Sequence, residues 1–343
     1  MSKHVSTPLN KGFQKAASYY YLLVSLFVLG VKFWAYYLTH SQAIFSDAVE
    51  SIINVGTAMI SIWVVHVSAK PADQDHPYGH GKIEYFSSAF EGGMIAVAAV
   101  VVAVEAIRTL IRGPEIHQLD QGIGLMVIAT LANLALGVYL LKVAKNSKSI
   151  TLRASGLHVL SDFWTTAGVV VSIGLVLLLK ITWIDPVCAL VIAVFLAKTG
   201  FDLVKQSVSG LLDAEDKEIL LSLKEIISAD VHPGIIQVHH CRIMRAGSYH
   251  HIDAHAVVPE FWNVLEAHKI TEEFEQRMID KYPYDGELHL HMDPCRRAYC
   301  SVCDVTTCPI RLSPYIKKLE ITLEDLVSPE EPEIFRRAGD HPG

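Results

Sequence analysis

Six long apolar stretches fill the first two-thirds of the chain, and shorter alternating segments follow them. Each stretch is long enough to cross a bilayer core of roughly 30 Å. Because backbone polar groups cannot stay unpaired in lipid, each stretch is predicted to be a helix. The predicted spans are residues 17–39, 41–67, 85–112, 121–143, 156–180 and 184–205. No small-residue cleavage site follows the first stretch, so it is expected to be a retained span rather than a signal peptide.

The periodicity changes at about residue 207. Residues 215–229 and 262–282 have helical periodicity, whereas residues 235–245, 249–258 and 286–292 alternate as strands do. This αββαβ order predicts a small, metallochaperone-like α+β domain with an antiparallel sheet. After Pro294 the pattern becomes irregular, and a mobile tail is expected.

These patterns predict a polytopic α-helical membrane protein with six transmembrane helices and a C-terminal cytoplasmic domain. Its expected parts are an N-terminal segment (1–16), a six-helix transmembrane domain (17–206), a soluble α+β domain (207–294) and a cysteine-containing extension (295–343).

Composition and charge support this picture. The 343-residue chain is 51% hydrophobic, and its mean hydropathy is +0.32, which is too apolar for an ordinary soluble enzyme. Lys and Arg concentrate before the first span and in the second and fourth connections, so both termini are predicted to be cytoplasmic. The net charge is −7, with no basic face evident, which argues against a nucleic-acid partner.

Two apolar stretches each carry a pair of metal-ligand residues four positions apart, Glu50 with Asn54 and His158 with Asp162. This spacing places each pair on one helix face. Two carboxylates, an imidazole and an amide oxygen suit Zn²⁺ or a neighbouring first-row metal. The alternative is interhelical hydrogen bonding without a metal. Asp47, one turn before Glu50, is expected to be an accessory ligand or proton acceptor, or else a solvated aspartate.

Two further groups of donors lie outside the spans. The loop PADQDHPYGHGKIEYF between the second and third spans carries Asp73, His76 and His80, which form a loop metal site or a merely solvated loop. The soluble domain is rich in histidine. Strand alternation places His289 with His291, and Asp253 with His255, on common faces that neighbouring strands can bring together around an ion.

Four of the six cysteines form a separate cluster after the last predicted strand. They are Cys295, Cys300, Cys303 and Cys308, spaced C-x4-C-x2-C-x4-C. In a reducing cytoplasm such a cluster predicts a structural metal site, a Zn²⁺ site or an iron–sulfur cluster, before it predicts disulfides. Free or redox-active thiols are the alternative.

At these residues the sequence resembles the cation diffusion facilitator family, whose members are six-span dimeric exporters of divalent metals. The loop PADQDHPYGHGKIE is close to the PADxxHxxGHGKxE signature of the branch with the bacterial zinc and iron exporters. HVLSDFWTT resembles the HxxxD motif of that family, and LHLHMDPC resembles the end of its cytoplasmic domain.

The resemblance implies roles for individual residues. It implies that Glu50, Asn54, His158 and Asp162 form the transport site and that Asp73, His76 and His80 form the loop site. It also implies a cytoplasmic site, made of His239, His255, His268, His291 and Asp293. The family's zinc and cadmium exporters usually have Asp or His at the positions of Glu50 and Asn54, so an unusual metal preference is expected to originate there.

The expected function is efflux of a divalent cation, Zn²⁺ before Fe²⁺, Mn²⁺, Co²⁺, Ni²⁺ or Cd²⁺, in exchange for protons. The expected protein is a homodimer in the lipid of a bacterial inner membrane, with metal sensed by its cytoplasmic domain. Two alternatives stay open. A membrane metalloenzyme would need a catalytic motif such as HExxH, which the sequence lacks. A non-transporting metal sensor would bind metal without flux.

Overall fold

The computed structural model describes residues 8–39, 42–112, 123–179, 183–229 and 234–336. The chain divides into two compact units, one ending at Leu212 and the other beginning at Asp213.

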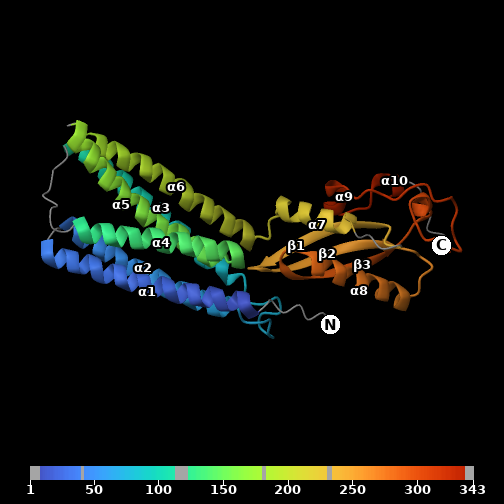
Figure 1. Cartoon of the computed structure of the whole chain (residues 1–343). Helices are drawn as coiled ribbons and strands as arrows, with labels where there is room; N and C mark the ends of the chain where they lie inside the picture. The colour runs from blue at the N-terminus through green and yellow to red at the C-terminus, as the bar shows by residue number, and fades with distance from the viewer. Residues whose placement is uncertain (1–7, 40–41, 113–122, 180–182, 230–233, 337–343) are drawn as a thin grey trace. The chain divides into compact units, whose positions relative to one another are not determined.

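Six long helices make up the first unit (Figure 1). They are α1 (Pro8–Thr39), α2 (Gln42–Ser68), α3 (Ile83–Arg112), α4 (Ile123–Ser147), α5 (Ile150–Leu179) and α6 (Ile184–Leu211). Among the described residues, α1 to α4 and α6 are long and apolar enough to cross a membrane. In α5 the backbone is helical throughout, but the side chains of residues 169–177 lie outside the described set. The predicted plan of helical spans is confirmed.

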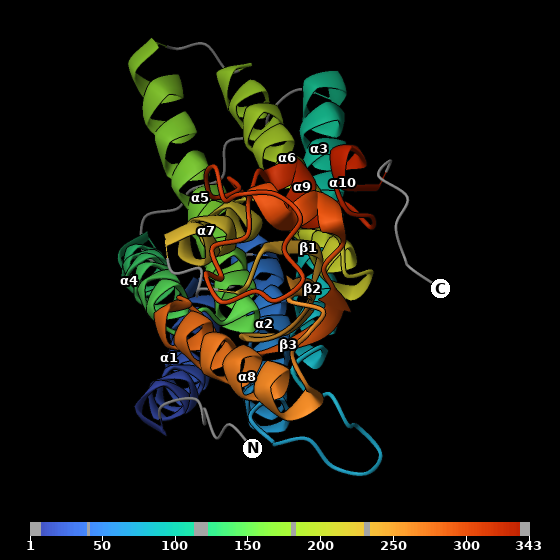
Figure 2. The same cartoon turned by 90° about the vertical axis from the view of Figure 1, so that its right-hand side faces the viewer.

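The six helices pack side by side, with α1, α2 and α4 on one side and α3, α5 and α6 on the other (Figures 1 and 2). The most extensive contact joins α3 to α6. It depends on glycine, because a Cβ placed on Gly200 would lie 2.7 Å from the carbonyl oxygen of Gly92 and 2.8 Å from the Ala96 nitrogen. Small residues thus let two membrane helices approach closely.

Glu84 of α3 caps the beginning of α5. Its Oε2 accepts hydrogen bonds from the Ser149 hydroxyl at 2.9 Å, from the Ile150 N–H at 2.9 Å and from the Thr151 N–H at 3.2 Å. The first N–H groups of a helix have no intrahelical acceptor, and a carboxylate also matches the positive end of the helix dipole. This contact fixes where α5, the helix with the HxxxD residues, begins against α3.

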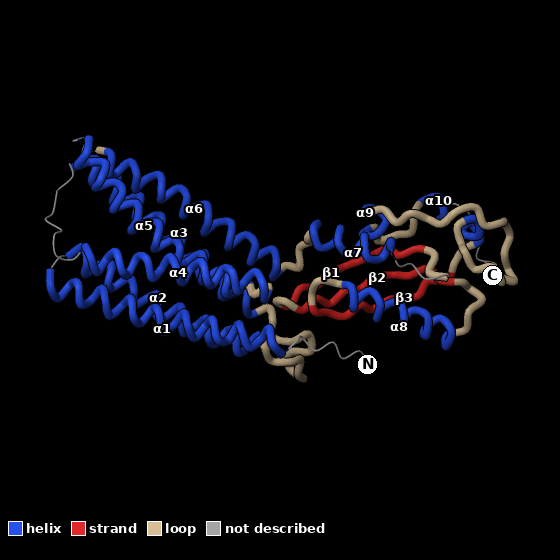
Figure 3. The backbone as a smooth tube through the Cα atoms, viewed as in Figure 1, coloured by secondary structure: helices blue, strands red, loops and turns tan. Residues whose placement is uncertain are grey.

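The second unit is built on a three-stranded sheet (Figure 3). Its elements are α7 (Lys217–Ala229), β1 (Gln237–Ala246), β2 (Tyr249–Val258), α8 (Val264–Lys281) and β3 (Asp285–Pro294). The strand order is β1-β2-β3; β1 and β2 are antiparallel, but β2 and β3 are parallel. The predicted αββαβ order is observed, whereas the prediction of an antiparallel sheet is wrong. Since α8 returns the chain along the sheet, β3 starts beside the start of β2.

The two faces of the sheet have different coverings. Ile252, Ala254 and Ala256 of β2 join side chains of α7 and α8 in the main core. Because side chains alternate along a strand, Val257 points to the opposite face, where it packs with Tyr299 and Cys303 from the chain after β3.

That chain forms a packed tail rather than a wholly irregular one. It contains a 3₁₀ turn (Arg297–Ser301), α9 (Leu323–Val327) and α10 (Glu333–Arg336). Leu326 of α9 is fully buried in the main core, and Phe335 of α10 stacks on Tyr299 with ring centres 4.0 Å apart.

Candidate metal-binding sites

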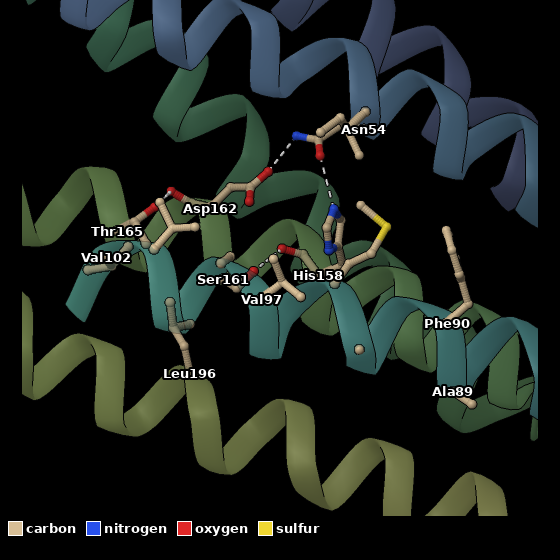
Figure 4. A pocket seen from close by; sticks show the side chains of 15 residues that line it. Asn54, Ala89, Phe90, Val97, Val102, His158, Ser161, Asp162, Thr165 and Leu196 are labelled. Atoms are coloured by element: carbon tan, nitrogen blue, oxygen red, sulfur yellow. Dashed lines mark hydrogen bonds between the residues drawn. The ribbon is translucent and has the colours of Figure 1, made fainter. Parts of the chain in front are cut away.

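Polar residues of the membrane unit meet where α2 contacts α5. Asn54 comes from α2, and His158 and Asp162 come from successive turns on one face of α5. Asn54 Nδ2 donates to Asp162 Oδ2 at 2.5 Å, and His158 Nε2 lies 2.9 Å from Asn54 Oδ1 (Figure 4). Since an amide oxygen can only accept, the imidazole is the donor in the second bond. Asn54 therefore bridges a carboxylate and a protonated ring nitrogen.

These three side chains line a cavity of about 710 Å³. Its other walls are largely apolar and come mostly from α3, including Phe90, Val97 and Val102 (Figure 4). Asn54 and His158 are each only 6% exposed. Buried polar groups that converge on one wall of a mostly apolar cavity are typical of a ligand site. The arrangement offers nitrogen and oxygen donors to a cation.

Two of the predicted residues precede Asn54 on α2. The side chains of Asp47 and Glu50 lie outside the described part of the structure. The helical backbone places Glu50 one turn before Asn54, on the same face. The fourth ligand of the tetrad therefore stays a prediction from spacing.

The sequence analysis missed a second buried polar group in the membrane unit. Glu91 of α3 is 1% exposed, and its Oε1 accepts a hydrogen bond from Ser155 of α5 at 3.0 Å. Ser155 lies one turn before His158, and its hydroxyl oxygen is 3.4 Å from the Ser61 hydroxyl of α2, from which it can accept. The signal was present, because an acidic residue in an apolar membrane stretch is costly and is by default functional.

The loop residues come together. Asp73 Oδ1 accepts the backbone N–H of His76 at 2.8 Å, and the rings of His76 and His80 are 4.4 Å apart. Gly79, with φ +82°, makes the turn that returns His80 towards Asp73, whose Oδ2 lies 3.4 Å from His80 Nε2. The hydrogen bond from His76 is the main reason that the pKa of Asp73 is lowered. Ligand atoms of all three residues lie within 4.8 Å of one another.

A third group lies on the sheet face opposite α7 and α8. Ligand atoms of His239, His255 and Asp293, one from each strand, lie within 4.8 Å of one another. His255 Nδ1 is 2.9 Å from Asp293 Oδ2, and His239 Nε2 is 3.7 Å from the same oxygen. Burial lowers the pKa of His239, against the opposing effect of Asp293. A neutral imidazole has the lone pair that a metal requires.

His240 joins this group through a β-bulge that the sequence pattern did not predict. The β1–β2 register shifts between His239 and Arg242, and His240 has φ +52°. This extra residue turns its ring towards β2, where His240 Nδ1 lies 3.2 Å from His255 Nε2.

The remaining predicted residues divide into those near this group and those outside it. His291 pairs with His255 across β2 and β3, and its Nε2 is 3.6 Å from Asp293 Oδ1. His268 is exposed on α8 and lies outside the group. Cys295, Cys300, Cys303 and Cys308 lie in the tail, and all four are free thiols.

Comparison with known proteins agrees with this architecture. Residues 18–212 match the cation efflux transmembrane domain, and residues 216–295 match the cytoplasmic domain of cation efflux proteins. The chain is 32% identical over 270 residues to an uncharacterized transporter of Synechocystis, which covers 79% of this chain and 87% of the relative. It is 26% identical over 282 residues to the cation-efflux pump FieF of Salmonella arizonae, with 79% and 90% covered.

The pump FieF of Salmonella schwarzengrund is also 26% identical, over 278 residues that cover 78% of this chain and 88% of the pump. The transmembrane match thus covers the six long helices, and the cytoplasmic match covers the unit that follows them. The chain therefore belongs to the cation diffusion facilitator family and is an integral membrane cation efflux transporter, not an enzyme.

Proposed function

We propose that this protein exports Zn²⁺ in exchange for protons, with Asn54, His158, Asp162 and Glu50 as its transport site. The observation that carries the proposal is the buried Asn54–His158–Asp162 network on the wall of a membrane cavity. An imidazole and carboxylates suit Zn²⁺, while Fe²⁺, Mn²⁺, Co²⁺, Ni²⁺ and Cd²⁺ are the competing cargoes.

The same hydrogen bonds support coupling to protons. In the metal-free network His158 Nε2 carries a proton, which it donates to Asn54 Oδ1. A metal ion that binds Nε2 requires this proton to leave, either for Nδ1 of the same ring or, where both ring nitrogens are protonated, for the solvent. Only the second case couples metal binding at His158 to proton release. Proton binding from the far side would then favour release of the metal, and movement of α2 against α5 would change which side has access.

The cytoplasmic unit is proposed to sense metal. His239, His255 and Asp293 bring donors from three strands to one point, with His291 and His240 beside them. Metal bound there would stabilise one arrangement of a homodimer and shift the population towards a transport-competent form. We place both termini in the cytoplasm, from the charges of the connecting loops. The bacterial origin of the similar transporters supports placement in a bacterial inner membrane.

Transport in proteoliposomes tests the proposal. Purified protein in vesicles with an acidic lumen should carry external Zn²⁺ inwards, and an ionophore that collapses the pH gradient should slow this flux. A flux that does not respond to the gradient would contradict antiport. Absence of flux from folded protein that still binds metal would favour the non-transporting sensor.

Asp162→Asn isolates the contribution of the site, because it removes a charge while keeping the size of the side chain. We expect the Zn²⁺ flux to fall at least roughly tenfold, as for loss of a metal-ligand contact. Glu105→Gln is the matched control, since Glu105 is exposed on α3 and does not line the cavity. Light scattering should show the same oligomer for both variants. Equal flux in the two variants would remove Asp162 from the transport site.

A further inference from the structure

The tail contains chemistry that the transport mechanism does not use. Cys295, Cys300, Cys303 and Cys308 occur within 14 residues, and both family matches end at or before the first of them. Cys295 follows β3 directly, and its N–H donates to the Val258 carbonyl at 2.8 Å. The first thiol is thus fixed to the sheet, while the other three lie in and after the 3₁₀ turn.

Three of these sulfurs accept hydrogen bonds from the backbone. The N–H of Glu260 donates to Cys295, the N–H of Val305 to Cys303, and the N–H of Leu312 to Cys300 at 3.4 Å. Cys300 and Cys303 are buried, at 7% and 5% exposed. Backbone donors to sulfur favour a thiolate, although burial has the larger effect and raises the pKa of Cys295 to about 11 and also raises that of Cys303. A neutral disulfide needs no such donors.

Arg311 holds the loop between the cysteines. Its guanidinium donates to the carbonyl of Cys300 at 2.6 Å, to that of Cys303 at 2.9 Å and to that of Val305 at 2.6 Å. It therefore fixes the backbone on both sides of Cys303 and places a positive charge beside the thiols. Four thiolates around a 2+ ion leave a net charge of −2, of which one neighbouring guanidinium offsets half.

The four sulfur atoms are neighbours, but they do not surround a common point at bonding distance. Cys295 lies near enough to Cys300 and Cys303, and Cys303 to Cys308, for their charges to interact. In the described part of the chain, however, no three of the four sulfurs lie within 4.8 Å of one another. Closing a tetrahedral site, with metal–sulfur bonds of about 2.3 Å, would contract the loop around the ion.

We propose that Cys295, Cys300, Cys303 and Cys308 bind a thiophilic divalent cation, Zn²⁺ first, in a tetrahedral thiolate site that fixes the tail onto the sheet. This site is distinct from the transport, loop and cytoplasmic histidine sites. Its ligands come from one continuous segment, so a single chain completes it.

The position of the tail gives this site a consequence. Arg296, Pro329 and Glu331 of the tail line a cavity of about 430 Å³ that also has His239 and Asp293 in its wall. The Tyr299 hydroxyl, next to Cys300, donates to Glu331 at 2.9 Å. An ion at the four thiols would therefore hold two acidic residues, Glu330 and Glu331, at the opening of the histidine site.

Cobalt binding to the full-length protein tests the proposal. Metal-free, reduced protein in detergent is titrated with Co²⁺, and thiolate-to-cobalt charge transfer is followed in the near ultraviolet. Histidine and carboxylate ligands do not produce this absorption. We expect it to saturate at one Co²⁺ per chain and to be displaced by Zn²⁺. Folded wild-type protein without the absorption would overturn the proposal.

Variants locate the ion. Each substitution removes one of the four thiolates. Cys303→Ser should abolish or strongly reduce the charge-transfer absorption, because Cys303 is buried within the loop. Cys308→Ser should weaken the absorption less, because Cys308 is less buried. Cys188→Ser is the matched control, because it removes one thiol from α6 and should leave the spectrum unchanged. Unchanged absorption in Cys303→Ser, or its loss in Cys188→Ser, would overturn the assignment. Proton-coupled Zn²⁺ flux is measured separately, so failure of one proposal does not decide the other.

Discussion

Asn54 donates to a carboxylate with one end of its amide and accepts from an imidazole with the other. A neutral amide in this position adds no negative charge, and its hydrogen bonds link the two ionisable side chains. The proton on His158 and the charge on Asp162 are therefore coupled through a residue that does not itself titrate.

Asn54→Asp should make Zn²⁺ binding at the transport site more dependent on pH. The added carboxylate would face Asp162 without the amide donor, so the two would share a proton when metal is absent. Metal binding should then release about one proton more than in the wild type. The slope of the logarithm of Zn²⁺ affinity against pH measures this number.

The reference background for this experiment is an Asp73→Ala, His239→Ala double variant, in which the loop and cytoplasmic sites are weakened. A slope equal to that of the unsubstituted background would contradict the proposed role of Asn54. Uptake assays with competing metals on the same pair would show whether this position also sets metal preference.

At the scale of elements, the start of α5 is held by a side chain of another helix. Glu84 of α3 accepts the first N–H groups of α5, and the connection from α4 consists of Lys148, with φ +54°, and Ser149. The orientation of the α5 face with His158 and Asp162 thus depends on a buried carboxylate of another helix.

Glu84→Ala should lower the free energy of unfolding by about 1–3 kcal/mol, because it leaves buried N–H donors unsatisfied. Glu84→Gln keeps an acceptor oxygen and loses only the charge, so its effect should be smaller. Thermal unfolding in detergent measures the order of the two variants. Hydrogen exchange should rise in the first turn of α5; no change there in Glu84→Ala would contradict the capping role.

How far the sequence predicted this structure also depends on particular elements. The four-residue spacing of His158 and Asp162 determines that they share a face, since helix geometry alone requires it. The parallel pairing of β2 with β3 was predictable from the 18-residue α8, because a crossover of that length joins parallel strands. The bulge at His240 was not, since its register shift depends on backbone pairing between strands. Nor did periodicity predict the tail, whose packing depends on single residues such as Phe335.

At the scale of the whole molecule, the transporter has metal-ligand groups in the membrane, in a loop and on a sheet. In the membrane, His158 and Asp162 both come from one face of α5. On the sheet, His239, His255 and Asp293 come from three different strands. The difference would matter for the proposed regulation. Metal bound to three strands would rigidify the sheet, whereas the proposed transport site would have to release its ion.

His255→Ala should remove metal from the cytoplasmic site while leaving the transport site intact. His255 contacts both Asp293 and His240, so its loss separates the remaining donors. We expect full-length protein to bind fewer Zn²⁺ ions per chain by calorimetry and to need more Zn²⁺ for half-maximal flux. The control is His289→Ala, which removes an exposed imidazole that pairs with Glu287 on the same face. Wild-type stoichiometry in His255→Ala would contradict the sensing role.

The parallel pairing of β2 with β3 also determines when the cytoplasmic site can first exist. β1 and β2 form a local hairpin, but β3 reaches its place only after α8 has folded back across the sheet. Pairing between segments far apart in the chain forms late, because the entropy of loop closure is lost before the stabilising contacts form. During synthesis His239 and His255 therefore emerge well before Asp293, and a nascent chain has two histidines but no complete site. Metal binding at the proposed site would thus mark a finished fold, because a chain stalled before β3 would lack the Asp293 ligand.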